Sequence, residues 1–323
     1  MTEKKPRLVV ILGPTASGKT ALSVELAKAL GTEIISGDSM LVYKGFDIGS
    51  AKPTLKERGG VLHHLIDVRE PWESYNVTDF VTEAGRLIAE LNGRGKLPLL
   101  AGGTGLYVKA LLEGYEFNET EGHAAYRAEL EELGRSRGRE YVHSLLAEAD
   151  PEAAARLHPN NFRRIVRALE VQHFGGERIS QARLAATDPK GVTRAGASLC
   201  YDALVLGLAR ERQGLYERIN RRVEQMFAEG LEQEVRELSA SGITRAMQAM
   251  KGIGYKETAA YLEGEMSREE AVELIQKSTR HFAKRQMTWY RKMPYIHWLP
   301  ADTLSGEELL AAALSAIRER WGA

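Results

Sequence analysis

The chain of 323 residues has one cysteine, Cys200. A single cysteine excludes a disulfide framework and a cysteine-based metal cluster, and it suits the reducing cytoplasm, where we expect the protein to act. The sequence also lacks a long apolar run near its start. Residues 8–12 (LVVIL) follow a polar, basic beginning and are too short for the apolar core of a signal peptide or for a membrane span. We therefore expect no membrane partner.

The sequence has no net charge, since 44 Lys and Arg residues balance 44 Asp and Glu residues. This balance excludes a chain-wide positive field that would attract nucleic acid, but local patches remain possible. Residues 156–194 contain eight basic and three acidic side chains. Residues 276–292 contain six basic and no acidic ones, with Phe282, Trp289 and Tyr290 interleaved. Such one-sided runs favour a polyanion partner, with a plain solvated helix face as the alternative.

A phosphate-binding motif is present at residues 13–20 (GPTASGKT), which fit the pattern G-x-x-x-x-G-K-[ST]. An apolar run precedes it and a helical pattern over residues 21–30 follows it. Glycines allow backbone N–H groups to turn inward around phosphate oxygens, and the helix N-terminus adds partial positive charge. The residues expected to hold phosphate are Gly13, Pro14, Thr15, Ala16, Ser17, Gly18, Lys19 and Thr20. Lys19 would reach the outer phosphate and Thr20 would hold Mg²⁺, whereas a tight turn without a ligand is the alternative.

The order of apolar runs and helical patterns predicts an α/β fold. Strands are expected at 8–12, 33–36 and 97–101, and they alternate with helices at 19–30 and 78–91. Such alternation predicts a parallel sheet with helices on both faces, as in P-loop NTPases. Residues 119–194 have no β-branched run and are rich in Ala, Glu, Arg and Leu, which predicts a helical insertion. The expected organisation is a core in two parts, 1–118 and 195–323, with the insertion at 119–194 between them.

The second part of the core should complete the sheet and add helices. The run 201–209 is expected to return to the sheet as a strand, and 295–299 as a last short strand. Helices are expected at 212–229 and 231–238. The sequence Ser267-Arg268-Glu269-Glu270 is a capping box that opens a helix running to about residue 292, and Ser305 caps a terminal helix that ends at Trp321.

Three predicted strands end in polar or glycine-rich turns, at 13–20, 37–39 and 102–105. Ligands of parallel sheets bind at the carboxyl ends of the strands, so these turns should converge on one crevice. Asp38 is a candidate general base or Mg²⁺ ligand there, or else an N-cap in a turn. Thr104 is a candidate donor to a phosphate or a base, or part of a packing turn.

Two further groups carry weaker signals. His63 and His64 are adjacent and have no third ligand spaced nearby, which favours polar contacts over a metal site. Arg218, Arg221 and Arg222 share one helix face. That face is able to neutralise a departing diphosphate if it turns toward the crevice, and it is otherwise a solvated surface.

The sequence resembles the tRNA dimethylallyltransferase family. The matching segments occur in the same order as in the family and span almost the whole chain. The segments that carry the resemblance are GPTASGKT (13–20), ISGDS (35–39), VY (42–43), DIGSAKP (47–53), HHLID (63–67), GGTGLY (102–107), LHPN (157–160), RALE (167–170), GYKE (254–257), AKRQ (283–286) and Trp289.

The resemblance implies a prenyltransferase that moves a dimethylallyl group from dimethylallyl diphosphate to N6 of adenosine 37 in the tRNA anticodon loop. Asp38 would take the proton from the adenine amine, Thr104 would assist or contact tRNA, and Arg222 would face the leaving diphosphate. Mg²⁺ is the implied cofactor, and the protein is expected to act as a monomer. The insertion would close over the anticodon stem-loop. The residues implied to contact tRNA are Asp38, Ser39, Met40, Leu41, Thr104, Arg127, Arg163, Arg164, Ile165, Val166 and Arg167.

The chain departs from the family pattern at four positions. Leu41 and Arg163 each stand where glutamine is usual in the family. Both positions bear on how the enzyme would recognise tRNA. Ser50 replaces threonine and Asn161 replaces aspartate, which are milder changes. Two other readings remain: a small-molecule or nucleoside kinase with ATP in the phosphate loop, and an RNA-binding ATPase without transferase chemistry.

Overall fold

The computed structural model describes residues 5–115, 123–175, 192–193 and 198–322. The chain divides into two compact units, which are described separately. Unit 1 comprises residues 1–114 and 191–323, and unit 2 comprises residues 115–190. Among the described residues, no helix combines the length and the apolar character needed to cross a membrane.

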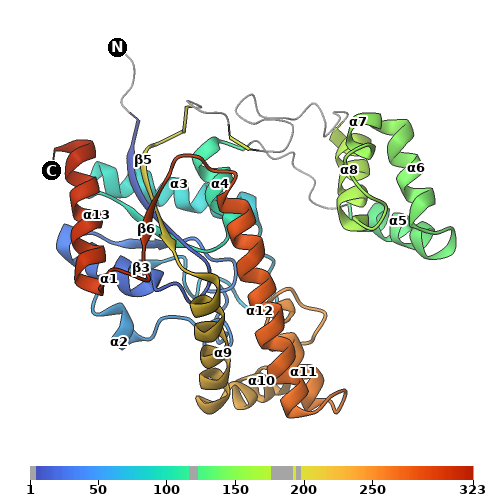
Figure 1. Ribbon diagram of the computed structural model, residues 1–323. Coiled ribbons are helices and arrows are strands. Elements are labelled where there is room, and N and C mark those ends of the chain that lie inside the picture. Colours follow the sequence, from blue (N-terminus) through green and yellow to red (C-terminus); the bar gives the residue numbers. More distant parts are fainter. Residues whose placement is uncertain (1–4, 116–122, 176–191, 194–197, 323) are drawn as a thin grey trace. The chain divides into compact units, whose positions relative to one another are not determined.

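Unit 1 is built on a parallel sheet, as the sequence predicts (Figure 1). In the described part of the chain the strand order is β3-β2-β4-β1-β5-β6, and every neighbouring pair is parallel. The strands are β1 (Arg7–Leu12), β2 (Ile34–Ser36), β3 (His63–His64), β4 (Leu99–Gly102), β5 (Asp202–Ala209) and β6 (Ile296–Pro300). Leu12 lies opposite Gly102, and Ser36 lies opposite Ala101. The turns that follow β1, β2 and β4 therefore leave the sheet at one edge.

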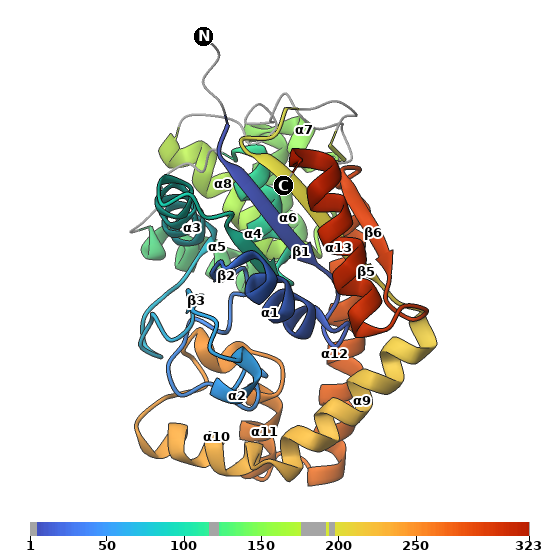
Figure 2. The ribbon, with the colours of Figure 1, turned by 90° about the vertical axis from the view of Figure 1, so that its left-hand side faces the viewer.

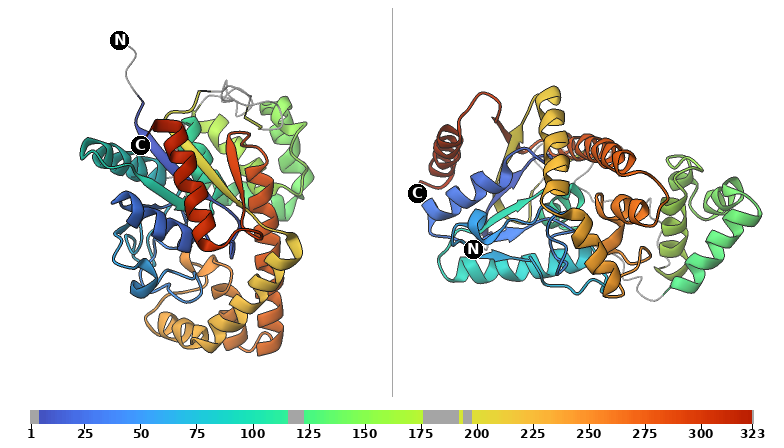
Figure 3. Two further views of the ribbon diagram at one scale, coloured as in Figure 1. Left: turned by 60° about the vertical axis from the view of Figure 1, so that its left-hand side comes forward. Right: turned by 90° about the horizontal axis from the view of Figure 1, so that it is seen from below.

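Helices cover both faces of the sheet because β1 is apolar on both sides (Figures 2 and 3). Val9 and Ile11 pack with α1 (Lys19–Leu30) and α13 (Gly306–Trp321). Val10 and Leu12 pack on the opposite face with α3 (Val77–Gly93) and α4 (Gly105–Glu113). The α/β prediction is thus confirmed.

Between β5 and β6 the chain forms a group of helices, most of which lie below the sheet in the view of Figure 1. It contains α9 (Arg212–Ala228), α10 (Leu231–Ala240), α11 (Tyr255–Leu262) and α12 (Arg268–Tyr290), with a 3-10 turn at Ala249–Lys251. The predicted capping box opens α12: the Ser267 hydroxyl accepts from the Glu270 N–H, and the Glu270 carboxylate accepts from the Ser267 N–H. Helices α9 and α12 pack side by side, and the Arg280 guanidinium donates to the Asn220 side chain.

Four elements were not expected from the sequence: α2 (Leu55–Arg58), β3, α4 and α11. Strand β3 has only two residues, too few for a period-two pattern. Helix α4 begins at Gly105, directly inside a turn whose glycines obscure a helix start. Strand β4 begins at Leu99 and not at the predicted residue 97. Pro98 precedes it and has no N–H to donate to a ladder.

Unit 2 is helical in its described part. It contains α5 (Ala124–Ser136), α6 (Arg139–Ala149), α7 (Pro151–Ala154) and α8 (Phe162–Gly175). Val142, Leu146, Ile165 and Leu169 form its core. Helix α7 begins with Pro151, and the Asp150 carboxylate accepts from the Ala153 N–H. Residues 176–191 and 194 of the predicted basic segment lie outside the described residues.

Candidate active site

The phosphate loop runs from the end of β1 to the start of α1 and has a shape that its sequence requires. Gly18 has φ 102°, which a side chain disfavours, and Ala16 also has a positive φ of 63°. A Cβ at Gly13 would lie 2.6 Å from the Ser17 Oγ, so only glycine fits there. No side chain caps the N-terminus of α1, so its first N–H groups remain for a ligand.

Three cationic side chains donate hydrogen bonds to carbonyl oxygens of the loop. Lys19 Nζ donates to the Pro14 oxygen at 2.8 Å, and Arg218 Nε donates to the Ala16 oxygen at 2.9 Å. Arg210 Nε donates to the Ser17 oxygen at 2.8 Å. These bonds draw the carbonyl oxygens outward and surround the loop with positive charge, which suits an anionic ligand. The predicted arginine face is thus turned toward the phosphate loop at Arg218.

Helix α12 ties the phosphate loop to the turn after β4. The Gln286 side-chain oxygen accepts from the Thr15 N–H at 2.9 Å, and its amide nitrogen donates to the Gly103 oxygen at 2.8 Å. The Tyr290 hydroxyl lies 3.0 Å from both the Gly13 and Gly103 carbonyl oxygens. Sequence reasoning missed both roles. It placed Tyr290 in an aromatic, basic surface, but the ring is buried, so Tyr290 offers no surface to a polyanion.

Asp38 and Thr104 lie on adjacent turns. The Asp38 Oδ1 accepts from the Met40 N–H at 2.8 Å, an Asx turn and not the helix N-cap weighed from the sequence. The Thr104 Oγ1 accepts from the Ser39 N–H at 3.2 Å, which leaves the hydroxyl proton for a ligand. The two turns touch closely, since a Cβ at Gly102 would lie 2.4 Å from the Gly37 oxygen.

The three turns border one cavity of about 450 Å³, as the sequence analysis expected. Its polar lining includes Thr15, Lys19, Thr20, Asp38, Thr104 and Arg222. Its apolar lining includes Met40, Leu41, Ile219, Val223, Met226, Ile275 and Phe282. A second cavity, of about 870 Å³, lies against the other side of the phosphate loop and includes Arg218 and Arg221. Lys19, Thr20, Ala51, Arg222 and Met226 border both cavities, so the loop is approached from two sides.

Positive charge is in excess where the two cavities meet at the phosphate loop. Burial, together with the Arg222 guanidinium, lowers the pKa of Lys19 from its ordinary 10.5 to about 8, while Asp38 opposes that change. Burial also lowers the pKa of Arg222. The Arg222 guanidinium contacts the Thr15 hydroxyl and the Ala51 oxygen, each at 3.4 Å. Two crowded cations gain from an anion bound between them.

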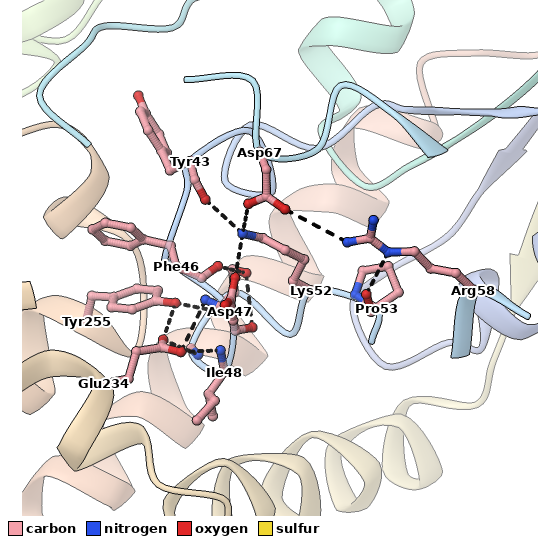
Figure 4. A network of polar contacts seen from close by, with 12 residues as sticks. Tyr43, Phe46, Asp47, Ile48, Lys52, Pro53, Arg58, Asp67, Glu234 and Tyr255 are labelled. Atoms are coloured by element: carbon pink, nitrogen blue, oxygen red, sulfur yellow. Dashed lines mark hydrogen bonds and ion pairs between the residues drawn. The ribbon is translucent and has the colours of Figure 1, made fainter. Parts of the chain in front are cut away.

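A loop at residues 47–52 borders both cavities. It is held by polar contacts with Glu234 and Tyr255 (Figure 4). The Glu234 carboxylate accepts from the N–H groups of Asp47, Ile48 and Gly49, at 2.7–3.2 Å. The Tyr255 hydroxyl donates to Glu234 at 2.7 Å and accepts from the Ser50 N–H at 3.0 Å. These contacts fix the backbone that places Ala51 beside Arg222.

Lys52, His63 and His64 of unit 1 also make polar contacts. The buried Lys52 ammonium donates to the Tyr43 oxygen and forms ion pairs with Asp47 and Asp67 (Figure 4). The His64 Nε2 lies 2.8 Å from the Glu33 carboxylate, and the Lys96 ammonium holds the pKa of Glu33 at about 2. The His63 Nδ1 lies 2.9 Å from the Val61 oxygen. The polar-contact interpretation of the two histidines is therefore confirmed.

Comparison with known proteins matches the sequence model described as IPP transferase to residues 41–293, and the one described as isopentenyl transferase to residues 6–73. The chain belongs to the IPP transferase family. It is 48% identical to the tRNA dimethylallyltransferase of Bacillus licheniformis, over 92% of each chain. It is 47% identical to that of Geobacillus thermodenitrificans, over 92% of this chain and 90% of the relative.

Solved structures of the IPP transferase family resemble this one. The tRNA isopentenylpyrophosphate transferase of Bacillus halodurans matches with a TM-score of 0.71 and 42% identity, over 98% of each chain. A eukaryotic dimethylallyltransferase, described as acting on tRNA, matches with a TM-score of 0.79 and 28% identity, over 98% of this chain and 80% of its own.

Unit 2 contains those of the implied tRNA-contact residues that do not line the cavity. Arg127 Nε and an Arg167 Nη donate to the buried Glu170 carboxylate at 2.6 and 2.9 Å. Ile165 and Val166 are buried in the core of unit 2. Packing leaves only their backbone for a contact with tRNA, and the expectation that these two residues contact tRNA stays a prediction. Arg163 and Arg164 are exposed.

A divalent metal at the phosphate loop would depend on few protein ligands. In the described ranges, no three His, Cys, Asp or Glu side chains gather as a metal site. Thr20 is exposed and borders both cavities next to Lys19. Mg²⁺ is commonly held by substrate phosphates, water and one or two protein oxygens, which fits a hydroxyl in this position.

Proposed function

We propose that this protein transfers a dimethylallyl group from dimethylallyl diphosphate to N6 of adenosine 37 in tRNA anticodon loops and releases diphosphate. The observation that carries the proposal is a single cavity lined both by Asp38 and by apolar side chains, with Lys19 and Arg222 bordering this cavity and the second one. The names of the bacterial relatives support the same reaction.

The diphosphate would lie in the phosphate loop. The uncapped N-terminus of α1 provides N–H groups, and Lys19 and Arg222 provide charge for the phosphate oxygens. The same groups stabilise the negative charge that accumulates on the departing oxygen in the transition state. Ser17 has a buried hydroxyl that makes no hydrogen bond within the described structure, and this donor is available to the ligand.

The adenine would enter the cavity of about 450 Å³ after leaving the stack of the anticodon loop, as base-modifying enzymes require. Its N6 attacks C1 of the prenyl chain, the C1–O bond breaks, and the bonding electrons leave with the diphosphate. The Asp38 carboxylate takes the N6 proton as a general base. The Thr104 hydroxyl donates a hydrogen bond to the adenine, and the Met40 N–H orients the Asp38 carboxylate.

Thr20 would hold Mg²⁺ by its hydroxyl, with the remaining ligands from diphosphate and water. When bound, the metal neutralises part of the diphosphate charge. Arg163 and Arg164 in unit 2, with Arg127 and Arg167 oriented by Glu170, would contact tRNA phosphates, and unpaired loop bases would supply sequence recognition. We further propose that one chain is sufficient for the reaction.

One experiment tests the reaction against its alternatives. The protein is incubated with Mg²⁺, dimethylallyl diphosphate and unmodified tRNA, and the tRNA is digested and its nucleosides are analysed by mass spectrometry. A gain of one dimethylallyl group on adenosine, located to position 37 by fragment mapping, supports the proposal. A parallel reaction with ATP replaces the prenyl donor. ATP turnover without nucleoside modification would instead favour a kinase or an RNA-binding ATPase.

A further inference from the structure

We propose that Ser36 binds a water molecule of the hydrated Mg²⁺ that accompanies the diphosphate, and so positions the metal beside Thr20. The inference deepens the proposed function, because it concerns the metal of the same site. It starts from a hydroxyl that the protein itself leaves without a partner.

Ser36 is the last residue of β2, and its side chain is 4% exposed. Its Oγ makes no hydrogen bond to any of the residues that the structure describes. A buried hydroxyl without a partner is destabilising, because it has lost its hydrogen bonds to water and gained none. Such a group is usually explained by water, an ion or a ligand. The surroundings of Ser36 indicate which of these applies.

The Ser36 side chain lies on the α1 side of the sheet. Along β2 the side chains alternate, since Ile34 packs in the core on the α1 side and Ile35 in the core on the opposite side. Ser36 therefore points to the α1 side. Thr20 and Ser23 of α1 border the same cavity as Ser36. The Ser23 hydroxyl donates to the Thr20 carbonyl oxygen at 2.9 Å, so Ser23 already has a partner.

Ser36 is thus an unpartnered hydroxyl on the side of the cavity where Thr20 would hold the metal. Mg²⁺ demands octahedral geometry and keeps several of its waters in protein sites. Thr20 already provides a protein hydroxyl for the metal, and a second hydroxyl at Ser36 can accept a hydrogen bond from the strongly polarised O–H of a water that the metal keeps. Groups that orient metal ligands in this way typically change metal affinity by 10–100-fold when removed.

The test compares Ser36→Ala with a matched control, Thr258→Val. Thr258 in α11 also has a fully buried hydroxyl without a hydrogen bond in the described structure, and it borders neither cavity. The probe is inorganic diphosphate, and the readout is the melting temperature of the protein as Mg²⁺ is titrated at fixed diphosphate. Ligand stabilisation measured in this way requires no catalysis.

We expect Ser36→Ala to raise the half-saturating Mg²⁺ concentration by roughly tenfold. Its melting temperature without ligand should stay equal or rise, because an unsatisfied hydroxyl has been removed. Thr258→Val should leave the Mg²⁺ titration unchanged. An unchanged titration in Ser36→Ala overturns the proposal, as does a fall in its ligand-free melting temperature, which would show that the hydroxyl has a partner within the fold.

Failure of this inference is distinguishable from failure of the proposed function. Wild-type protein that transfers the prenyl group while Ser36→Ala keeps its Mg²⁺ titration refutes only the role of Ser36. Wild-type protein that binds Mg²⁺ and diphosphate, with the tenfold effect of Ser36→Ala, but does not modify tRNA refutes only the reaction.

Discussion

Replacing Lys19 by methionine should stabilise the ligand-free protein and abolish its function. The lysine is held in a site that disfavours its charge, since burial and Arg222 lower its pKa to about 8. Methionine has a similar length and no charge. The variant therefore removes the unfavourable ammonium and keeps most of the packing, while it deletes the group expected on the outer phosphate.

The magnitude follows from the pKa of Lys19. A fall from 10.5 to about 8 corresponds to about 3 kcal/mol that disfavours the charged amine in the folded state. Lys19 is only partly buried by exposed area, so water screens part of this cost, and we retain about 2–3 kcal/mol. The lost hydrogen bond to the Pro14 oxygen costs about 1 kcal/mol. The net gain at pH 7 is therefore about 1–2 kcal/mol.

The gain should depend on pH with a defined sign. Below pH 8 the lysine is protonated in both states, and its cost to the folded state is fully present. Between pH 8 and 10.5 the unfolded chain binds a proton that the folded protein does not, so wild-type stability rises with pH. The advantage of Lys19→Met should accordingly shrink across this range.

The assay is denaturant unfolding followed by tryptophan fluorescence at pH 7 and pH 10. All four tryptophans, at positions 72, 289, 298 and 321, belong to unit 1, so the signal reports on the unit that contains the site. Lys28→Met is the matched control, because Lys28 lies on the same helix, is exposed and pairs with Glu25 at 2.8 Å. A Lys19→Met protein that is less stable than wild type at pH 7, or whose advantage is equal at both pH values, would refute the reasoning. In transfer assays the same variant should lose at least about a hundredfold in rate.

The other predictions concern single roles in the proposed reaction. Asp38→Asn should bind both substrates and lower kcat, because it removes a base and little volume; a change confined to the KM for tRNA would instead make Asp38 a recognition residue. Gln286→Ala should destabilise unit 1 by about 2 kcal/mol in fluorescence-detected unfolding and weaken diphosphate binding, because the Thr15 N–H and the Gly103 carbonyl lose their partner. Neutralising Arg163 and Arg164 together should reduce the salt slope of tRNA binding, measured by filter binding, and leave diphosphate binding unchanged. Leu41→Gln should raise kcat/KM for tRNA by a few-fold, about 1 kcal/mol, and sharpen the preference for the bases beside the target; a large fall in melting temperature with unchanged base preference would show that Leu41 acts through packing.

The sheet and the phosphate loop were predictable because their signals are local. A strand, a glycine-rich turn and a helix follow one another within residues 7–30, and period and motif are enough to place them. The placement of Asp38 and Thr104 at one cavity was predictable, because the carboxyl ends of parallel strands lie at the same end of the sheet. This inference needs only the strand assignments. The wall at residues 47–52 and its contacts with Glu234 and Tyr255 had no such signal, since side-chain contacts to distant backbone leave no period in the sequence.

The roles of Gln286 and Tyr290 show the same limit. They are four residues apart on α12, and that spacing indicates only that they share a helix face. The sequence presents them within a basic, aromatic segment, which led to the interpretation of an exposed polyanion surface. Their partners are backbone atoms of Thr15, Gly13 and Gly103, and such partners are independent of side-chain type.

The contact between Thr15 and Gln286 has a consequence for how the protein is made. The two residues are 271 positions apart, so the ribosome must synthesise almost the whole chain before the phosphate loop meets the helix that holds it. Unit 2, by contrast, is one continuous segment whose described core contacts are all within reach as soon as it emerges. We therefore expect the helical insertion to fold in the nascent chain before the phosphate loop can form its contact with α12. In that interval the loop lacks its native contacts with α12 and is exposed to non-native ones.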